Sequence, residues 1–131
     1  MNRAAQYQKL NVESVVDSAS PHQLINMLFD GACARLKKAQ GCIAHGDIEG
    51  RSEAITATVS IVSGLQASLD HERGGDLADN LESLYDYIQR RLFRANSDND
   101  AQALEEVIDL IKTLHDAWSA IGQDMVQPQH A

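Results

Sequence analysis

The chain has 131 residues, of which 44% are hydrophobic and 23% are charged, and this is the composition of a single globular domain. Its formal net charge of −8 argues against a nucleic-acid-binding protein, because binding the phosphate backbone requires a basic face. No apolar run approaches the ~20 residues that span a bilayer, and the stretch from Met1 to Tyr7 lacks the apolar block of a secretory signal. We therefore expect a cytoplasmic protein without membrane insertion.

Residues 1–19 form a leader in which apolar residues follow neither a helical nor a strand period. These residues are Tyr7, Leu10, Val12, Val15 and Val16. So many apolar side chains in a short polar segment favour an N-terminal arm that lies against the body of the protein. The alternative is a frayed terminus.

The motif Ser20-Pro21-His22-Gln23 predicts the start of a first long helix. Serine caps the helix, proline suits its first position, and Gln23 completes a capping box. Apolar residues then recur at helical spacing, namely Ile25, Leu28, Ala32, Leu36, Ala39 and Ile43. We expect this helix to end near His45-Gly46. Asp47 then caps the next helix at once, so the second helix folds back antiparallel.

The second helix is expected to follow Asp47 and to reach Leu69. Its apolar positions are Ile48, Ile55, Val59 (or Thr58), Val62, Leu65 and Leu69. Its helix propensity is poor because β-branched residues are frequent and Gly50 and Gly64 interrupt it. A strand is the competing interpretation. The helical spacing and the lack of alternation favour the helix.

The segment from Asp70 to Asp76 predicts the second reversal of the chain. Gly74 and Gly75 tolerate the positive φ angles that end a helix, and Asp76 is expected to cap the third helix. One apolar stripe follows, made of Leu77, Leu81, Leu84, Ile88, Leu92 and Ala95. The run from Ser97 to Asp100 then turns the chain again.

The fourth helix shows the most regular spacing. Its apolar residues are Leu104, Val107, Ile111, Leu114, Trp118 and Ile121, and Gly122 is expected to end it. Four amphipathic helices joined by short turns predict an all-α fold, an antiparallel up-down four-helix bundle. We expect an N-terminal arm at 1–19, the bundle at 20–122 and a flexible C-terminal tail at 123–131.

The sequence offers no candidate for catalysis or for metal binding. A di-iron bundle needs Glu-x-x-His pairs, but Cys42, Ser68 and Lys112 stand three residues before the histidines in question. Phosphate-binding glycine motifs are absent, and neither Cys33 nor Cys42 has an activating partner in the pattern. We therefore predict no catalytic residue, no metal, no cofactor and no enzyme activity. A bundle enzyme or metal protein is the alternative.

The helices carry more apolar residues than the stripes need. Some of this surplus is expected in the core, and the remainder, together with the arm, is expected to form an apolar groove for a partner. Tyr85 and Tyr87 differ by about 200° around their helix, so at least one of them must lie near the surface. The predicted partner-binding residues are Tyr7, Leu10, Val16, Ile61, Tyr85, Tyr87, Ile108 and Leu110.

A set of short motifs spans nearly the whole chain, from Tyr7 to Ile121. They are Ala19-Ser20-Pro21, Leu24-Ile25, Met27-Leu28-Phe29-Asp30-Gly31, Ser68-Leu69-Asp70, Gly74-Gly75, Asn80-Leu81, Leu84-Tyr85-Asp86-Tyr87, Arg91-Leu92, Ala95-Asn96, Glu106-Val107 and Ala117-Trp118. Taken together, these motifs resemble the FliS family of flagellar secretion chaperones.

This resemblance implies an antiparallel four-helix bundle that binds newly made flagellin in the bacterial cytoplasm. It also implies that the protein holds the disordered C-terminal segment of flagellin, prevents premature polymerisation and delivers its client to the flagellar type III export apparatus. Tyr7 would then be an arm residue that packs into the groove. The alternative is a helical adaptor or regulator of flagellar assembly, acting through self-association or another soluble partner.

Overall fold

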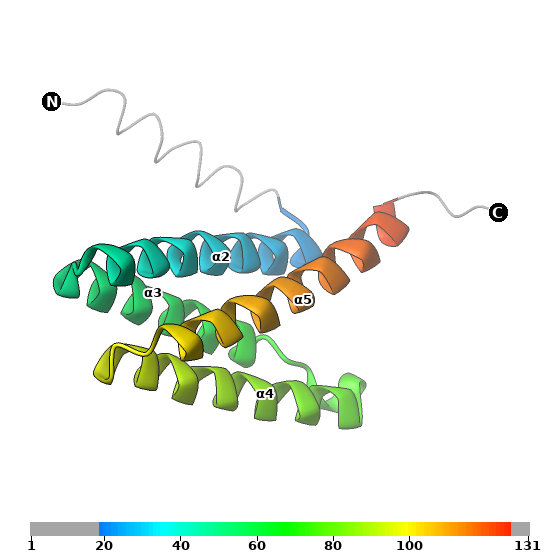
Figure 1. The fold of residues 1–131 in the computed structure, drawn as a ribbon. Helices are drawn as coiled ribbons and strands as arrows, with labels where there is room; N and C mark the ends of the chain where they lie inside the picture. The colour runs from blue at the N-terminus through cyan, green and yellow to red at the C-terminus, as the bar shows by residue number, and fades with distance from the viewer. Residues whose placement is uncertain (1–18, 127–131) are drawn as a thin grey trace, which may run out of the picture.

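The computed structural model describes residues 19–126, with side chains up to residue 122. This part of the chain contains four helices and no strand: α2 (Pro21–His45), α3 (Ile48–Ala67), α4 (His71–Ser97) and α5 (Ala101–Val126). Each helix packs against two others, with α3 and α5 contacting both α2 and α4. The helices thus close into a ring of antiparallel neighbours, as Figure 1 shows. The predicted all-α four-helix bundle is confirmed.

Three of the predicted helix boundaries are confirmed by their capping contacts. At the start of α2, the Gln23 amide donates to Ser20 Oγ at 3.1 Å, and the Ser20 amide donates to Gln23 Oε1 at 2.8 Å. Gly46 ends α2 with a φ of 72°, and Asp47 then accepts the Gly50 amide at 2.9 Å. Asp100 caps α5 in the same way. These ends follow from local hydrogen bonding alone, which explains why the sequence predicts them.

The reversal between α3 and α4 differs from the prediction. Asp70, and not Asp76, caps α4, because its carboxylate accepts the Arg73 amide at 3.2 Å. One helical turn, His71 to Gly74, therefore precedes the glycine break. Gly75 alone of the two glycines has a positive φ, 50°, and it kinks α4 without ending a helix.

The predicted end of the last helix at Gly122 is wrong, since α5 continues to Val126. A glycine here is explained by packing. A Cβ at position 122 would collide with the imidazole of His22, which lies directly against the α5 backbone. Gly122 therefore permits a close approach between α2 and α5.

The bundle core is made of the stripe residues from the middle of each helix. Fully buried members include Leu36, Val62, Ile88, Leu92, Val107 and Ile111. On α3 the buried position is Thr58, whose hydroxyl donates to the Ala54 carbonyl at 2.8 Å, while Val59 is only partly buried. Residues at the ends of the stripes are exposed instead, namely Ile48 (66%), Leu77 (66%) and Ile121 (49%). Assigning these three to the core was wrong, because no helix covers them.

Candidate partner-binding groove

An apolar groove opens at the end of the bundle where α3 ends and α4 begins. It has a volume of about 440 Å³ and is bordered by all four helices. Its apolar lining consists of Ile25, Leu65, Leu69, Leu77, Ala78, Leu81, Tyr85, Leu114, Ala117, Trp118 and Ile121. We call this surface the end groove. In Figure 1, α4 and α5 diverge from the turn that joins them toward this end.

Two large apolar side chains remain exposed at the end groove. Leu77 on α4 is 66% exposed and Ile121 on α5 is 49% exposed. The polar side chains that line the groove are Ser68 and Asp70, both in the connection between α3 and α4. An exposed apolar hollow of this kind is typical of a surface that binds another polypeptide.

A clasp between α2 and α5 fixes the position of Trp118 in this groove. The His22 and Trp118 rings stack with centroids 4.6 Å apart and planes 5° apart. The Trp118 indole donates to the His22 carbonyl at 3.0 Å, and His22 Nε2 donates to the Trp118 carbonyl at 2.7 Å. Because four constraints act on one residue pair, the indole is held rigidly at the groove wall. The same clasp brings the start of α2 beside the groove.

The rim of the end groove carries a histidine held between two carboxylates. His71 Nδ1 lies 2.9 Å from Asp79 Oδ1, and His71 Nε2 lies 3.4 Å from Glu82 Oε2. The contact spans the Gly75 kink, so it ties the first turn of α4 to the rest of the helix. The hydrogen bond to Asp79, followed by the charges of Glu82 and Asp70, raises the pKa of His71 above 6.5.

The raised pKa of His71 predicts a stability that falls as pH rises. The folded state favours the protonated imidazole, so its stabilising effect is complete below pH 6.5 and is lost as pH rises through the higher folded pKa. His71→Gln should therefore lower the thermal midpoint in mildly acidic buffer and leave it unchanged in alkaline buffer. Circular dichroism melts across this range measure the difference. A difference that grew with pH would contradict the assignment.

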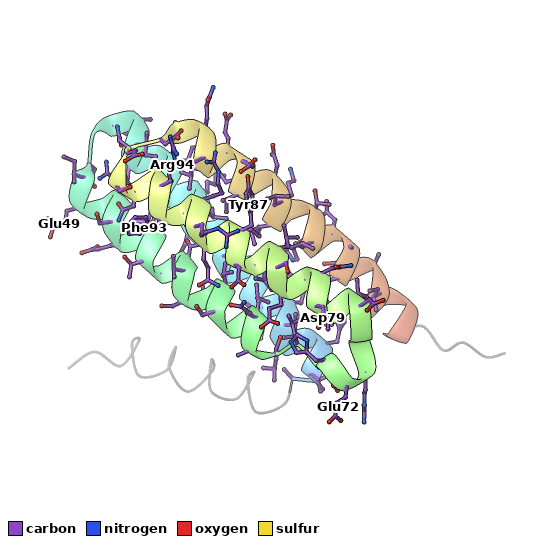
Figure 2. All side chains as sticks on the ribbon, turned by 90° about the horizontal axis from the view of Figure 1, so that it is seen from below. Glu49, Glu72, Asp79, Tyr87, Phe93 and Arg94 are labelled. Carbon is purple, nitrogen blue, oxygen red and sulfur yellow. The ribbon has the colours of Figure 1, made fainter. Side chains whose placement is uncertain are left out.

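A second polar cluster joins α4 to α5 in the middle of the bundle. The Tyr87 hydroxyl and the Arg91 guanidinium both donate to Glu106 Oε1, at 2.7 and 2.8 Å. The hydrogen bond from Tyr87, followed by that from Arg91, lowers the pKa of Glu106, and the Tyr87 pKa is raised in turn. In Figure 2, Tyr87 lies between Asp79 at one end of α4 and Phe93 at the other. The cluster therefore has a structural role between the two helices.

One cysteine lies close to a histidine and an aspartate. Cys33 Sγ is 3.8 Å from His115 Nδ1, and His115 Nε2 is 3.0 Å from Asp30 Oδ1. Burial, followed by the negative charges of Asp30 and Asp116, raises the pKa of the Cys33 thiol. A thiol that stays protonated is a poor nucleophile. Within residues 19–126, no three His, Cys, Asp or Glu side chains gather in a way that could hold a metal ion.

The sequence matches the profile of a known protein family over nearly its whole length. The family is described as "Flagellar protein FliS", and the match covers residues 3–125. The chain belongs to the FliS family.

Individual FliS relatives are similar over most of their own length as well. The chain is 50% identical over 117 residues to the flagellar secretion chaperone FliS of Salmonella typhimurium, covering 88% of this chain and 87% of that protein. It is 39% identical over 122 residues to the flagellar secretion chaperone FliSB of Pseudomonas aeruginosa, covering 93% and 97%. The match to FliS of Escherichia coli is 39% identical over 124 residues, covering 92% and 91%.

Among the described residues, no helix of this FliS-family chain has the length and apolar character needed to cross a membrane. The chain is therefore similar to proteins named as chaperones, and its described surface combines an apolar end groove with charged helix faces.

The partner-binding residues predicted from the sequence lie in several places on the FliS bundle. Tyr85 is buried and borders the end groove. Tyr87 lies at the α4–α5 contact, Ile108 borders a separate cavity between α2 and α5, and Leu110 packs against the core. Ile61 packs beside Gly31 on α2. The structure therefore brings one of these five to the end groove and spreads the others over the bundle.

The three remaining predicted partner-binding residues, Tyr7, Leu10 and Val16, lie outside the described residues. Sequence reasoning missed Leu77, Trp118 and Ile121 as groove residues because they continue the regular core stripes. The signal that could have found them is their position at the first or last turn of a stripe, where a bundle stops covering its own apolar residues.

Proposed function

We propose that this chain is a flagellin-specific export chaperone of the bacterial cytoplasm. It binds the disordered C-terminal segment of flagellin, prevents premature polymerisation, and hands the client to the flagellar type III export apparatus. It does so by binding alone, without catalysis. Membership of the FliS family and the chaperone names of the similar proteins support this proposal.

The observation that carries the proposal is the end groove with its exposed Leu77 and Ile121. A disordered segment loses conformational entropy when it folds onto a partner, so it needs a large apolar surface to compensate. Apolar side chains of the client, presented on a helix or an extended segment, meet this need in a groove between helices. Because the ordering cost is subtracted, the resulting affinity is reversible, as release into an export channel requires.

We further propose that the N-terminal arm covers the end groove when no client is present. The arm precedes Pro21, and the first turn of α2 is fastened to Trp118, which lines the groove. From Ala19 back to Tyr7 the chain spans at most about 40 Å, so Tyr7, Leu10 and Val16 are all within reach of the groove. A reversible cover limits the exposure of an apolar surface in the empty protein.

The function is tested by calorimetric titration of the full chain with a peptide of the flagellin C-terminal segment. We expect saturable binding with a dissociation constant in the micromolar range or below, and a negative heat-capacity change from apolar burial. A scrambled peptide of identical composition is the control. Absence of binding at high micromolar peptide, or equal binding of the scrambled peptide, would reject the proposal.

A second candidate function is that of an adaptor or regulator of flagellar assembly, acting through self-association or another soluble partner. One observation favours it. Phe93 on α4 is 73% exposed and lies near the end of the helix opposite to the end groove. Sedimentation of the full chain with and without the flagellin peptide distinguishes the two functions, because an adaptor that works through its own copies associates without the client.

A further inference from the structure

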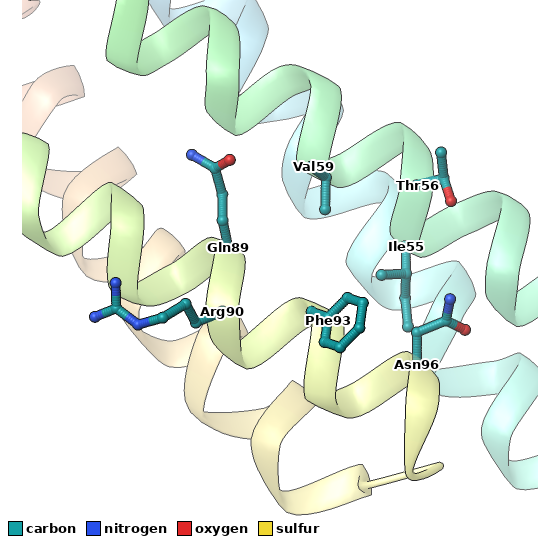
Figure 3. A pocket seen from close by; sticks show the side chains of 7 residues that line it. All are labelled: Ile55, Thr56, Val59, Gln89, Arg90, Phe93 and Asn96. Carbon is teal, nitrogen blue, oxygen red and sulfur yellow. The ribbon is translucent and has the colours of Figure 1, made fainter.

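A second apolar groove lies on the seam between α3 and α4. It has a volume of about 390 Å³ and is bordered by Ile55, Thr56 and Val59 of α3 and by Gln89, Arg90, Phe93 and Asn96 of α4. We call it the Phe93 groove. Figure 3 shows the Phe93 ring beside the gap between the two helices, with Val59 and Ile55 on the facing side.

The Phe93 groove is separated from the end groove by a row of polar contacts across the same seam. Gln89 donates to Gln66 at 2.9 Å, Gln66 donates to Asp86 at 2.8 Å, and Ser63 donates to Gln89 at 3.4 Å. Phe93 is twelve residues from Leu81 of the end groove, which corresponds to about 18 Å along α4. The two grooves are therefore separate surfaces.

The edge of the Phe93 groove is positively charged, although the whole chain carries a net charge of −8. Arg90 stands one helical turn before Phe93 and lies 6.0 Å from the centre of the Tyr87 ring. It makes no ion pair within residues 19–122, whereas Arg94 lies 3.6 Å from both Asp98 and Asp100. Arg51 donates to the neutral amides of Asn96 and Asn99. The groove thus combines an exposed aromatic ring with a guanidinium that is available to an external carboxylate.

We propose that the Phe93 groove docks an amphipathic helix of a second protein partner, with an apolar side chain against Phe93 and a carboxylate paired with Arg90. A furrow between two antiparallel helices accepts the ridge of a third helix, which favours a helical occupant. A second copy of this chain is disfavoured because two chains of net charge −8 repel each other. This docking surface goes beyond the proposed binding of flagellin.

The test uses two designed helical peptides of about 16 residues that share leucines at i and i+4. They differ at one position beside the leucines, which is Glu in the first peptide and Lys in the second. Fluorescence anisotropy measures their binding to the full chain at low and physiological salt. We expect the Glu peptide to bind about three- to fivefold more tightly at low salt, with a smaller ratio at higher salt. Arg90→Glu should reverse this preference.

Phe93→Ala should weaken both peptides by about tenfold, because the aromatic ring supplies most of the apolar contact. Ile48→Ala is the matched control, since Ile48 is also exposed (66%) but does not border the groove. Circular dichroism checks that each variant folds. Three results would overturn the proposal: equal binding of the peptides to all variants, a Phe93-dependent dimer in sedimentation, or a more than twofold loss of flagellin-peptide binding in Phe93→Ala.

Discussion

Replacing Leu77 and Ile121 together by serine is expected to weaken binding of the flagellin C-terminal segment by about 30- to 100-fold. Both side chains are exposed in the free protein and border the end groove. Covering them with a client removes apolar surface from water, and losing this contribution at two positions costs about 2–3 kcal/mol of binding free energy. Calorimetric titration of the double variant with the flagellin peptide measures the loss.

The same double variant should keep its fold, since neither side chain contributes to the buried core. The matched control is Ile48→Ser, which removes a side chain of equal exposure (66%) at the opposite end of the bundle. This control should bind the peptide within a factor of about two. Unchanged affinity in the double variant, or equal loss in the control, would remove the end groove as the client site.

Replacing Leu92 by alanine is expected to reduce the free energy of unfolding by about 3 kcal/mol. Leu92 is fully buried (0% exposed) in the middle of α4, and its truncation leaves a cavity in the core. For a domain of this size the thermal midpoint should fall by roughly 10 °C. Urea denaturation followed by circular dichroism gives the free energy directly.

The adjacent residue supplies the control for this second prediction. Phe93 is larger than Leu92 but is 73% exposed, so Phe93→Ala should change the free energy of unfolding by less than about 1 kcal/mol. The two neighbours thus separate stability from binding on the same helix. If both substitutions destabilised the protein equally, the described orientation of α4 would be wrong.

The starts of three helices and the reversal after α2 were predicted from the sequence because short-range contacts decide them. The Ser20 capping box, the positive φ of Gly46 and the Asp47 cap each involve residues within four positions of one another. At Asp70 two neighbouring signals competed, and local reasoning chose the wrong cap. At Gly122 it failed because the deciding contact comes from His22, a hundred residues earlier in the chain.

The candidate site was predicted only in part. An apolar surplus was recognised and Tyr85 was included, but Leu77, Trp118 and Ile121 were assigned to core stripes. Spacing along one helix identifies the face that a residue occupies. It does not identify what stands opposite, and the predicted Ile61, Ile108 and Leu110 lie at other helix contacts for this reason.

The sequence by itself determined the four helices, their antiparallel order and the family, because capping, spacing and motif content are properties of the chain alone. Only the tertiary structure decided where apolar side chains stay exposed. A stripe residue such as Leu92 is buried where neighbouring helices surround it, whereas Leu77 and Ile121 lie where α4 and α5 diverge. Burial depends on the distance between helices, and that distance is set by contacts between residues far apart in sequence, such as the clasp of His22 with Trp118.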